Sequence, residues 1–464
     1  MNAPWIWIIL PMVVAAILFF LRANQKIAGI LSIISQLLLA AMAGWLPIGM
    51  TTKVGPFVIE ISSTLNILGR RLVLENTDRS YLVYLFILGT VWALLTMVVK
   101  PDRLMPSLQL TIIVLLVSAR AVEPFLFGAL LIEMAILTSI PMMVPPGTSP
   151  SRGVMRYLIF QTLALPFILL AGWAFGMVQI DPANKGVLLR ASVALGLGFA
   201  FWLAVFPFYS WIPMLSEKVH PIAFGFILSL LPFIILMLGL DFLNGYIWIK
   251  QGIMLVPILQ VTGLVMIVTG GVWAAFQHNL SRLVGYAIIL DTGFMLLAVS
   301  LQNRLGMETF AANWIPRQIS LLILIFGLSV LRSREIPPTI EGIKGIGTRF
   351  PILASAMALA MASFVGLPLT GGFPVRETLL GELGSQMPLL VGWVLVGVCG
   401  FLFSMLRCIA SFFHSDNIRW NVEETWYEGL IIIAAMVLLI GTGIFPAGFY
   451  KGIFQLLSGF PNLP

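Results

Sequence analysis

Long apolar stretches follow one another from one end of the chain to the other, separated by short polar segments. A helix needs about 20 consecutive apolar residues to cross a bilayer, and the period-two alternation of a membrane barrel is absent. The pattern therefore predicts an all-α integral membrane protein with about 14 transmembrane helices. The predicted spans are 3–22, 26–48, 80–99, 104–120, 122–145, 153–176, 187–213, 221–244, 253–277, 280–301, 308–331, 350–381, 386–413 and 427–453.

Two of these spans contain helix breakers and are predicted to be discontinuous. Proline inside a helix removes a hydrogen bond and clashes with the preceding turn, and a broken helix is tolerated at membrane depth where it lines a cavity or contacts protein. The breakers of "FAFWLAVFPFYSWIP" and the following turn are Pro207, Pro213 and Pro221, and those of "VGLPLTGGFPVRETLL" are Pro368, Gly371, Gly372 and Pro374.

Paired broken helices are typical of transporters built from inverted repeats, where the breaks mark the ion site. The chain is therefore predicted to be a single polytopic membrane domain, residues 1–464, with two halves related as inverted five-helix repeats. The first half covers residues 79–245 and the second covers 250–413. Outside the spans, "GPFVIEISSTLNILGRRLVLENTDRS" alternates apolar and polar residues and predicts a small β-hairpin at the membrane surface, near residues 55–79.

Composition agrees with the pattern and limits the function. Hydrophobic residues make up 59% of the 464 residues and charged residues only 10%, whereas globular chains carry about 25% charged residues. The net charge of +7 comes from Lys and Arg in short loops, where they act as orientation signals rather than as a nucleic-acid surface. The loops opposite the termini hold about 14 of these residues against about 11 on the other side, which predicts that both termini are non-cytoplasmic.

No catalytic centre, cofactor or metal site is expected within the chain. Cys399 and Cys408 fall on opposite faces of one predicted helix, and His220, His278 and His414 have no partner at a metal-ligand spacing. A glycine-rich phosphate loop, an iron–sulfur cysteine cluster and a nucleophile with a base are also absent from the sequence. Redox centres, if the function needs them, are expected in partner subunits.

Ionisable residues within the spans are the candidate functional residues, because they are costly in a bilayer. They are Glu133, Asp291, Arg317, Arg376 and Glu377. Each has a structural alternative. Glu133 would be a protonated acid bonded to a backbone carbonyl, Asp291 a cap at a helix irregularity, and Arg376 and Glu377 a self-neutralising pair. Arg317, like Arg156, would extend along its stem to the interface.

Several motifs resemble the antiporter-like membrane subunits of respiratory complex I and of its relatives, the Mrp-type sodium/proton antiporters and membrane-bound hydrogenases. The similar stretches are "AVFPFYSWIPMLSEKVHPIAFGFIL", "NLSRLVGYAIILDTGFML", "EGIKGIGTRFP" and "GLPLTGGFPVRETLL", whereas "LLIEMAILT" matches only at its glutamate. The resemblance spans roughly residues 80 to 410, and it implies a bacterial inner-membrane protein that assembles with other membrane subunits in the lipid bilayer and handles protons or sodium.

The resemblance also implies a row of charged residues at mid-membrane, along which protons pass. Carried over by position, the family glutamate is Glu133 and the tenth-span histidine is Asp291. The lysines of the seventh, eighth and twelfth spans fall on Trp202, Leu231 and Arg376. The His and Lys of the eleventh span fall on Arg317 and Leu321.

These replacements bear on proton transfer. A buried lysine can lose and regain a proton, whereas arginine stays charged, and tryptophan and leucine do not titrate. Glu133, Asp291 and Glu377 remain as carriers, and the relay is predicted to be interrupted between the fifth and tenth spans. Three hypotheses stay open: a subunit of a complex-I-like, redox-driven translocase that moves protons by an altered route, a non-pumping structural subunit of the same assembly, and a free-standing cation/proton antiporter.

Overall fold

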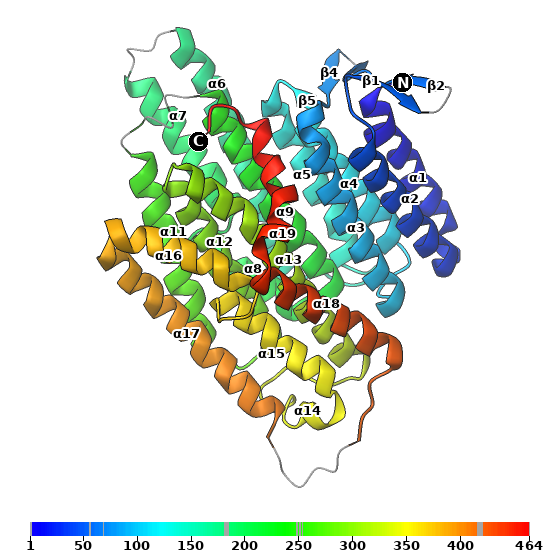
Figure 1. The fold of residues 1–464 in the computed structure, drawn as a ribbon, viewed down its shortest axis with the longest axis vertical. Helices are drawn as coiled ribbons and strands as arrows, with labels where there is room; N and C mark the ends of the chain where they lie inside the picture. The colour runs from blue at the N-terminus through cyan, green and yellow to red at the C-terminus, as the bar shows by residue number, and fades with distance from the viewer. Residues whose placement is uncertain are drawn as a thin grey trace. The chain divides into compact units, whose positions relative to one another are not determined.

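The structure is a computed structural model that describes residues 2–54, 57–67, 69–180, 185–246, 249, 252, 254–414 and 421–463. The chain packs into two compact units. Unit 1 comprises Met1–Leu203, Phe226–Ile249 and Ser458–Asn462, and unit 2 comprises Ala204–Gly225, Lys250–Leu457 and Leu463–Pro464. The elements of each unit can be followed by colour and label in Figure 1.

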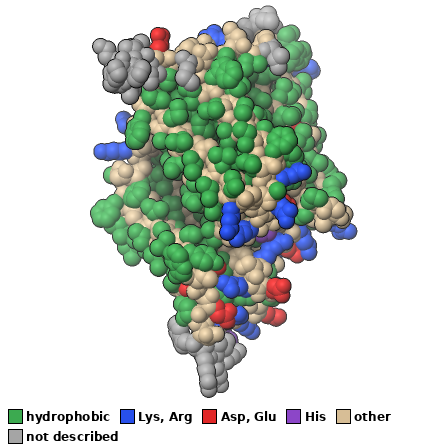
Figure 2. Space-filling model, turned by 90° about the vertical axis from the view of Figure 1, so that its right-hand side faces the viewer, with side chains coloured by type: hydrophobic (Ala, Val, Ile, Leu, Met, Phe, Trp, Pro, Cys, Tyr) green, Lys and Arg blue, Asp and Glu red, His purple; other side chains and the backbone are tan. Residues whose placement is uncertain are grey.

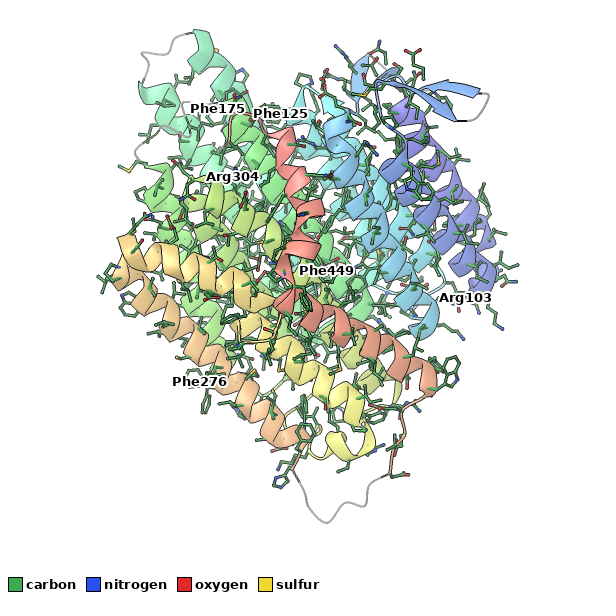
Figure 3. The ribbon with its side chains drawn as sticks, viewed as in Figure 1. Arg103, Phe125, Phe175, Phe276, Arg304 and Phe449 are labelled. Atoms are coloured by element: carbon green, nitrogen blue, oxygen red, sulfur yellow. The ribbon has the colours of Figure 1, made fainter. Side chains whose placement is uncertain are left out.

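Unit 1 is a helical bundle that carries all the described β-strands. Its helices are η1 (Trp5–Ile9), α1 (Leu10–Phe20), η2 (Leu21–Ala23), α2 (Gln25–Trp45), η3 (Asn76–Asp78), α3 (Arg79–Val99), α4 (Met105–Ala121), η4 (Phe125–Phe127), α5 (Gly128–Met143), α6 (Arg152–Ile180), α7 (Lys185–Trp202) and most of α9 (Pro221–Gly245). Aromatic rings fill part of the core: Phe125 and Phe175, labelled in Figure 3, both pack edge-on against the ring of Phe242 in α9.

Unit 2 is also a helical bundle. Its helices are η5 (Phe208–Ser210), α8 (Trp211–Lys218), the first residues of α9, α11 (Leu255–Ala275), α12 (Leu280–Ser300), α13 (Arg304–Ser333), α14 (Ile346–Arg349), α15 (Pro351–Val365), α16 (Gly372–Gln386), α17 (Pro388–Phe412), α18 (Trp426–Ile444), α19 (Pro446–Phe454) and the start of η6 (Gln455–Gly459).

The membrane character predicted from the sequence is confirmed. Within the described residues, eleven helices are long and apolar enough to cross a membrane, and three shorter apolar helices accompany them. Hydrophobic side chains also cover much of the upper part of the face shown in Figure 2, whereas many of the Lys, Arg, Asp and Glu side chains lie lower on it. The count of fourteen spans stays a prediction. The last predicted span, 427–453, was wrong as a single helix, because the chain turns at Phe445 between α18 and Pro446 at the start of α19.

The predicted β-hairpin is confirmed and has additional strands beside it. β3 (Thr64–Ile67) and β4 (Arg70–Val73) pair antiparallel, with Thr64 opposite Val73 and Ile67 opposite Arg70. β5 (Val122–Glu123) extends this sheet on the far side of β4, and β1 (Thr51–Val54) pairs with β2 (Phe57–Glu60) in a separate two-stranded sheet. The sequence pattern did not predict β5, because two residues are too few to show alternation.

Both predicted helix breaks are present. α7 ends at Trp202, and the chain continues through the positive φ of 55° at Ala204 before η5 and α8 begin. α15 ends at Gly366, whose φ of 86° gives the left-handed C-cap in which glycine is favoured, and Leu369 follows with a φ of 70°. Strain of this kind persists only where the surrounding packing holds it in place.

The predicted breakers occupy two kinds of position around these breaks. Pro207 and Pro368 lie in the non-helical segments, and Gly371 is the N-cap of α16. Three prolines lie within the first turn of the following helix, where their missing backbone donor costs nothing: Pro213 in α8, Pro221 in α9 and Pro374 in α16. Gly372 is the first residue of α16.

The centre of unit 2 is α12, in which every residue except Arg282 is buried. The helix begins where the Asn279 side chain accepts the backbone N–H groups of Ser281 and Arg282. It approaches α11 closely because glycines face each other: a Cβ built on Gly293 would lie 2.6 Å from the Gly263 carbonyl oxygen. The polar side chains that α12 carries are therefore buried inside the helical bundle.

Candidate functional site

The most concentrated group of buried charges in the described residues lies on three helices of unit 2. Asp291 of α12 forms an ion pair with Arg317 of α13, with 2.6 Å between Oδ2 and Nη1. Its other carboxylate oxygen, Oδ1, forms an ion pair with Nη2 of Arg376 on α16. The side chains of Asp291 and Arg317 are 1% and 0% exposed, and that of Arg376 is 4% exposed. We call these three residues the inner cluster.

Two neutral side chains fix the geometry of the inner cluster. Asn313 donates from Nδ2 to both carboxylate oxygens of Asp291 at 3.2 Å, and its Oδ1 accepts from Arg376 Nη1 at 3.1 Å. Thr292 accepts a further bond from Arg317 Nη1 at 3.2 Å. Asn313 and Arg317 are four residues apart on α13 and therefore share one helix face. The sequence reasoning missed Asn313 and Thr292, although the spacing in "NWIPRQIS" was a usable signal for Asn313.

The second helix break brings Arg376 to this position. A Cβ built on Gly366 would lie 2.5 Å from Cγ of Arg376, so that the side chain runs directly over the glycine backbone. A Cβ on Gly372 would lie 1.9 Å from the carbonyl oxygen of Ser363, and the Gly372 N–H donates to the Ser363 hydroxyl at 3.1 Å. Small residues at both ends of the break thus let α16 begin against α15, with its first turns facing the inner cluster.

The inner cluster carries more positive than negative charge. One carboxylate faces two guanidinium groups, and no other acid in the described part of the chain forms an ion pair with either arginine. Nε and Nη2 of Arg317 and Nε of Arg376 have no hydrogen-bond partner. Aromatic faces contact both groups, with the Phe294 ring centroid 3.9 Å from the Arg376 guanidinium and the Trp314 centroid 5.3 Å from that of Arg317. Such contacts contribute only about 0.5–2 kcal/mol each.

The structural alternatives considered from the sequence do not describe these arginines. Arg376 pairs with Asp291 rather than with Glu377, which is exposed and lies about 100° further around α16. Arg317 does not extend to an interface, because its whole side chain is enclosed. Asp291 bonds side chains from two other helices instead of capping its own. The three charges therefore form one group, and Glu377 is not part of it.

The first candidate residue, Glu133, lies on α5 of unit 1 in a different environment. It is 6% exposed, its Oε1 accepts from the Thr162 hydroxyl at 2.7 Å, and its Oε2 is buried without a partner. Among the described residues it forms no ion pair. The structural alternative required a protonated carboxyl that donates to a backbone carbonyl, whereas Glu133 accepts its hydrogen bond from a hydroxyl. Gln161, which precedes Thr162 on α6, donates to the backbone oxygen of Trp202 at 3.2 Å.

The two positions where the resemblance places lysines in unit 1 are fully packed. Trp202 and Leu231 are each 2% exposed. Trp202 is the last residue of α7 and packs edge-on against Phe199, whereas Leu231 lies within α9 next to Pro232. Neither side chain carries a charge.

Unit 1 also contains an ionic group that the sequence reasoning missed. Arg120 near the end of α4 pairs with Asp78 of η3 at 3.0 Å and with Asp241 of α9. The three side chains are 10–17% exposed, and the Phe460 ring centroid lies 5.1 Å from the Arg120 guanidinium. We call Asp78, Arg120 and Asp241 the outer cluster. Their wide separation in sequence gave no local pattern to predict it.

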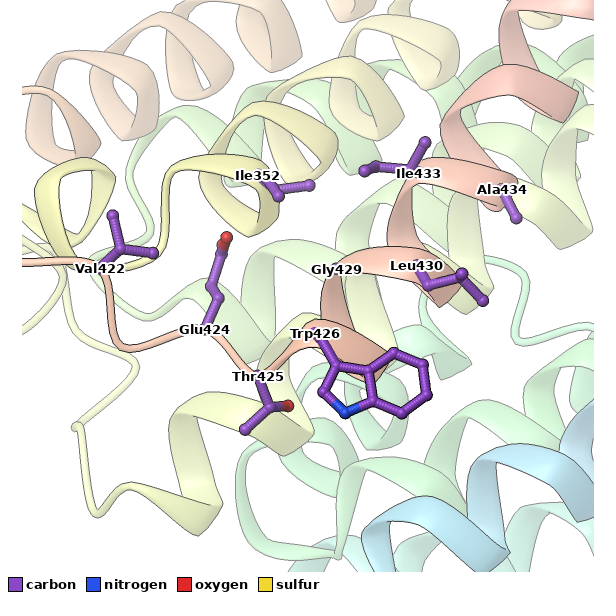
Figure 4. A pocket seen from close by; sticks show the side chains of 9 residues that line it. All are labelled: Ile352, Val422, Glu424, Thr425, Trp426, Gly429, Leu430, Ile433 and Ala434. Atoms are coloured by element: carbon purple, nitrogen blue, oxygen red, sulfur yellow. The ribbon is translucent and has the colours of Figure 1, made fainter.

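The structure contains a cavity in each unit, and the cavity in unit 1 borders the outer cluster. In unit 2 a cavity of about 530 Å³ at the start of α18, shown in Figure 4, is lined mainly by apolar residues. Half-buried Glu424 lines it too, and its carboxyl accepts from the backbone N–H of Leu353 at 2.8 Å. In unit 1 a cavity of about 680 Å³ borders Asp78 and Arg120 of the outer cluster and is also lined by residues of β4, β5 and η3. Within the described residues, no three His, Cys, Asp or Glu side chains gather in a metal-binding arrangement.

Comparison with known proteins relates this geometry to a protein family. Residues 157–404 match the model of the family described as NADH:quinone oxidoreductase/Mrp antiporter, TM. NADH-quinone oxidoreductase subunit N of Chromohalobacter salexigens is 24% identical over 74% of this chain and 76% of its own length. The protein of the same name from Psychrobacter arcticus is 23% identical over 96% of this chain and 94% of its own.

Solved structures show the same fold along almost the whole chain. A chain of the archaeal membrane-bound sulfane sulfur reductase, a respiratory membrane complex, superposes with a TM-score of 0.80 at 16% identity and covers 100% of both chains. A chain of the Mrp complex from Dietzia gives 0.79 at 14% identity, covering 98% of this chain and 96% of that one. A chain of respiratory complex I from Thermus thermophilus gives 0.77 at 18% identity and covers 99% of both.

Proposed function

The chain belongs to the NADH:quinone oxidoreductase/Mrp antiporter membrane family, and from this premise we propose that it is a structural, non-pumping subunit of a complex-I-like redox-driven assembly. It is an antiporter-like membrane subunit of the kind found in complex I and Mrp assemblies. The proposal adds that its inner cluster holds neighbouring helices together and does not pass protons. The observation that carries the proposal is the pairing of Asp291 with two arginines.

The groups of the inner cluster are poorly suited to exchanging a proton. Arginine keeps its proton at any physiological pH, unlike the lysine that the family resemblance places at the position of Arg376. A proton that approached Asp291 would meet two permanent positive charges at hydrogen-bond distance. It would also have to replace bonds to Arg317, Arg376 and Asn313, which together occupy both carboxylate oxygens. This arrangement supports a fixed structural role.

We place the redox cofactors of the assembly in its other subunits. Relatives that carry the name NADH-quinone oxidoreductase subunit N suggest an electron-transferring assembly whose cofactors lie in other subunits. The chain would lie in a bacterial inner membrane with both termini on the non-cytoplasmic side, as the Lys and Arg of its loops suggest. The ion moved by the rest of the assembly would be the proton, with sodium as the alternative.

Proton uptake per electron tests the proposal in the intact assembly reconstituted into vesicles. We expect Asp291→Asn to leave this ratio unchanged when it is normalised to the assembled complex, and deletion of the whole chain to lower the yield of that complex. A ratio that falls in Asp291→Asn, or an assembly that forms in full without the chain, contradicts a structural role.

Glu133 favours a second candidate, a subunit that still translocates protons by a route through unit 1. Its carboxyl is buried, and among the residues that the structure describes it is bonded to Thr162 and to no arginine, so it keeps the ability to take up and release a proton. Under this alternative, Glu133→Gln lowers the uptake ratio while Thr162→Val, which removes its partner but no titratable group, lowers it less. An unchanged ratio in Glu133→Gln rules out this route.

A further inference from the structure

We propose that the inner cluster binds a small monovalent anion of halide size, such as chloride, between Arg317 and Arg376. The basis is the charge of the cluster. Asp291 supplies one negative charge and the two arginines supply two positive charges, all in side chains that are at most 4% exposed. This inference concerns a binding site and does not depend on whether the subunit moves protons.

Magnitudes show why the excess charge needs a partner. A buried charge without a counter-charge destabilises the fold strongly. The aromatic faces of Phe294 and Trp314 offset only part of this cost, because a cation–π contact is weaker than an ion pair between buried groups. Arginine has no neutral form at physiological pH, so it cannot escape the cost by losing its proton, as a buried lysine can. An anion removes the cost directly.

Hydrogen-bond donors are available for such a ligand. The N–H groups at Nε and Nη2 of Arg317 and at Nε of Arg376 are buried and find no partner among the described residues. Ser320, three residues after Arg317 on the same side of α13, is 1% exposed, and its hydroxyl also has no partner. These groups are donors, and Ser320 is the only one of them that also accepts, so the ligand they suit is an acceptor with negative charge.

The enclosure limits the size of the ligand. The arginine side chains are 0% and 4% exposed, and Asn313 and Thr292 already occupy the N–H groups on the Asp291 side. A monatomic anion needs only to meet two or three N–H groups, whereas a carboxylate or phosphate from a larger molecule would need an open path between helices. The geometry therefore points to a halide.

The test uses the full chain purified in detergent, with the unfolding midpoint measured as sodium gluconate is replaced by sodium chloride or bromide at constant ionic strength. A ligand that binds only the folded state raises this midpoint with its concentration. We expect chloride and bromide to raise the midpoint relative to gluconate. The same response to all three anions overturns the proposal.

Three variants make the test specific. Arg376→Met removes the excess positive charge and is expected to abolish the halide response. Asp291→Asn doubles the excess and is expected to enlarge it, which keeps the test decisive if Arg376→Met does not fold. Arg103→Met removes an exposed arginine of unit 1, labelled in Figure 3, and is expected to respond like the parent chain. A halide response that is unchanged in both cluster variants overturns the proposal.

Bromide locates the site directly. In crystals of the full chain grown with bromide, anomalous scattering is expected to show a peak within hydrogen-bond distance of the Arg317 and Arg376 nitrogens that have no protein partner. Bromide found only at surface positions, or no peak at the cluster, overturns the proposal.

Discussion

The outer and inner clusters are mirror images in charge. In unit 1 one arginine, Arg120, lies between two aspartates, whereas in unit 2 one aspartate, Asp291, lies between two arginines. Side chains of the outer cluster are 10–17% exposed and border a cavity, but those of the inner cluster are at most 4% exposed. The two groups therefore have opposite excess charges in different surroundings.

A surplus carboxylate can be neutralised by a proton, whereas a surplus guanidinium cannot lose its charge at physiological pH. In the outer cluster, Asp78 and Asp241 share one arginine. Either aspartate can bind a proton or contact water, and both changes reduce the surplus negative charge. A surplus guanidinium has neither means of relief, since it does not titrate and the inner cluster is enclosed. The inner cluster thus needs a permanent counter-charge, and it is also the group less suited to exchanging protons.

The largest expected effect comes from removing the central charge of the inner cluster. Asp291→Asn removes the carboxylate that pairs with two buried arginines, and we expect the free energy of unfolding to fall by about 3–5 kcal/mol. Asp241→Asn in the outer cluster leaves Arg120 paired with Asp78 and no buried charge without a partner, so we expect a smaller loss of about 1 kcal/mol, as for an ordinary point mutant. Denaturation of the full chain in mixed micelles, followed by circular dichroism, measures both.

Equal losses in these two variants would show that burial does not distinguish the clusters. The comparison has a further check in Asp78→Asn, which leaves Arg120 paired with Asp241 and should behave like Asp241→Asn. A loss in either outer variant that matches the loss in Asp291→Asn contradicts the argument.

A smaller effect is expected from the glycine that lies under Arg376. In Gly366→Ala the new Cβ would meet Cγ of Arg376 at 2.5 Å and would sit at a φ of 86°, which alanine adopts at a cost. We expect a loss of about 1–2 kcal/mol in the free energy of unfolding, from backbone strain together with displacement of the arginine. The same denaturation experiment measures it.

Gly384→Ala is the matched control, because Gly384 lies on α16 and has open space around its Cβ position. Alanine there should stabilise the helix by roughly 0.5–1 kcal/mol. The halide response of Gly366→Ala sharpens the comparison, since an arginine that has moved should bind the anion less well. An unchanged response would place Arg376 outside the proposed site.

Much of the fold could be predicted from the sequence because apolar length and helix breakers are local signals. The broken helices around Pro207 and Pro368 and the hairpin around Gly69 followed from such signals. The division of the last span at Phe445 was missed, since a proline at the start of a helix and one inside a helix look alike in an apolar run.

The site was less predictable because its partners come from distant parts of the chain. Asp291, Arg317 and Arg376 were each identifiable as costly charges in a span, but the sequence did not indicate that they pair with one another. Proximity in sequence suggested Glu377 as the partner of Arg376, whereas helix geometry turns the neighbouring residue about 100° away. The outer cluster was missed for the same reason, since Arg120 and Asp241 meet only in the folded unit.

The smallest expected effect separates the clusters from another source of pH dependence in unit 2. His220 precedes Pro221 at the start of α9, and its Nδ1 accepts the backbone N–H of Ile222 at 3.3 Å, which requires the neutral ring. Burial, together with the positive charge of Arg332, lowers the pKa of His220 to about 4. Because the unfolded chain binds this proton at a pKa of about 6.5, the fold loses stability as the pH falls below that value and until it reaches the folded pKa.

We expect a loss of about 1 kcal/mol between neutral pH and pH ~5.5 in the parent chain. His220→Asn, which still caps the helix but does not titrate, should lose less over that range, while His278→Asn at an exposed position should follow the parent. If the acid loss persists in His220→Asn, other titratable groups cause it, and the stabilities of the two clusters have to be compared at neutral pH alone.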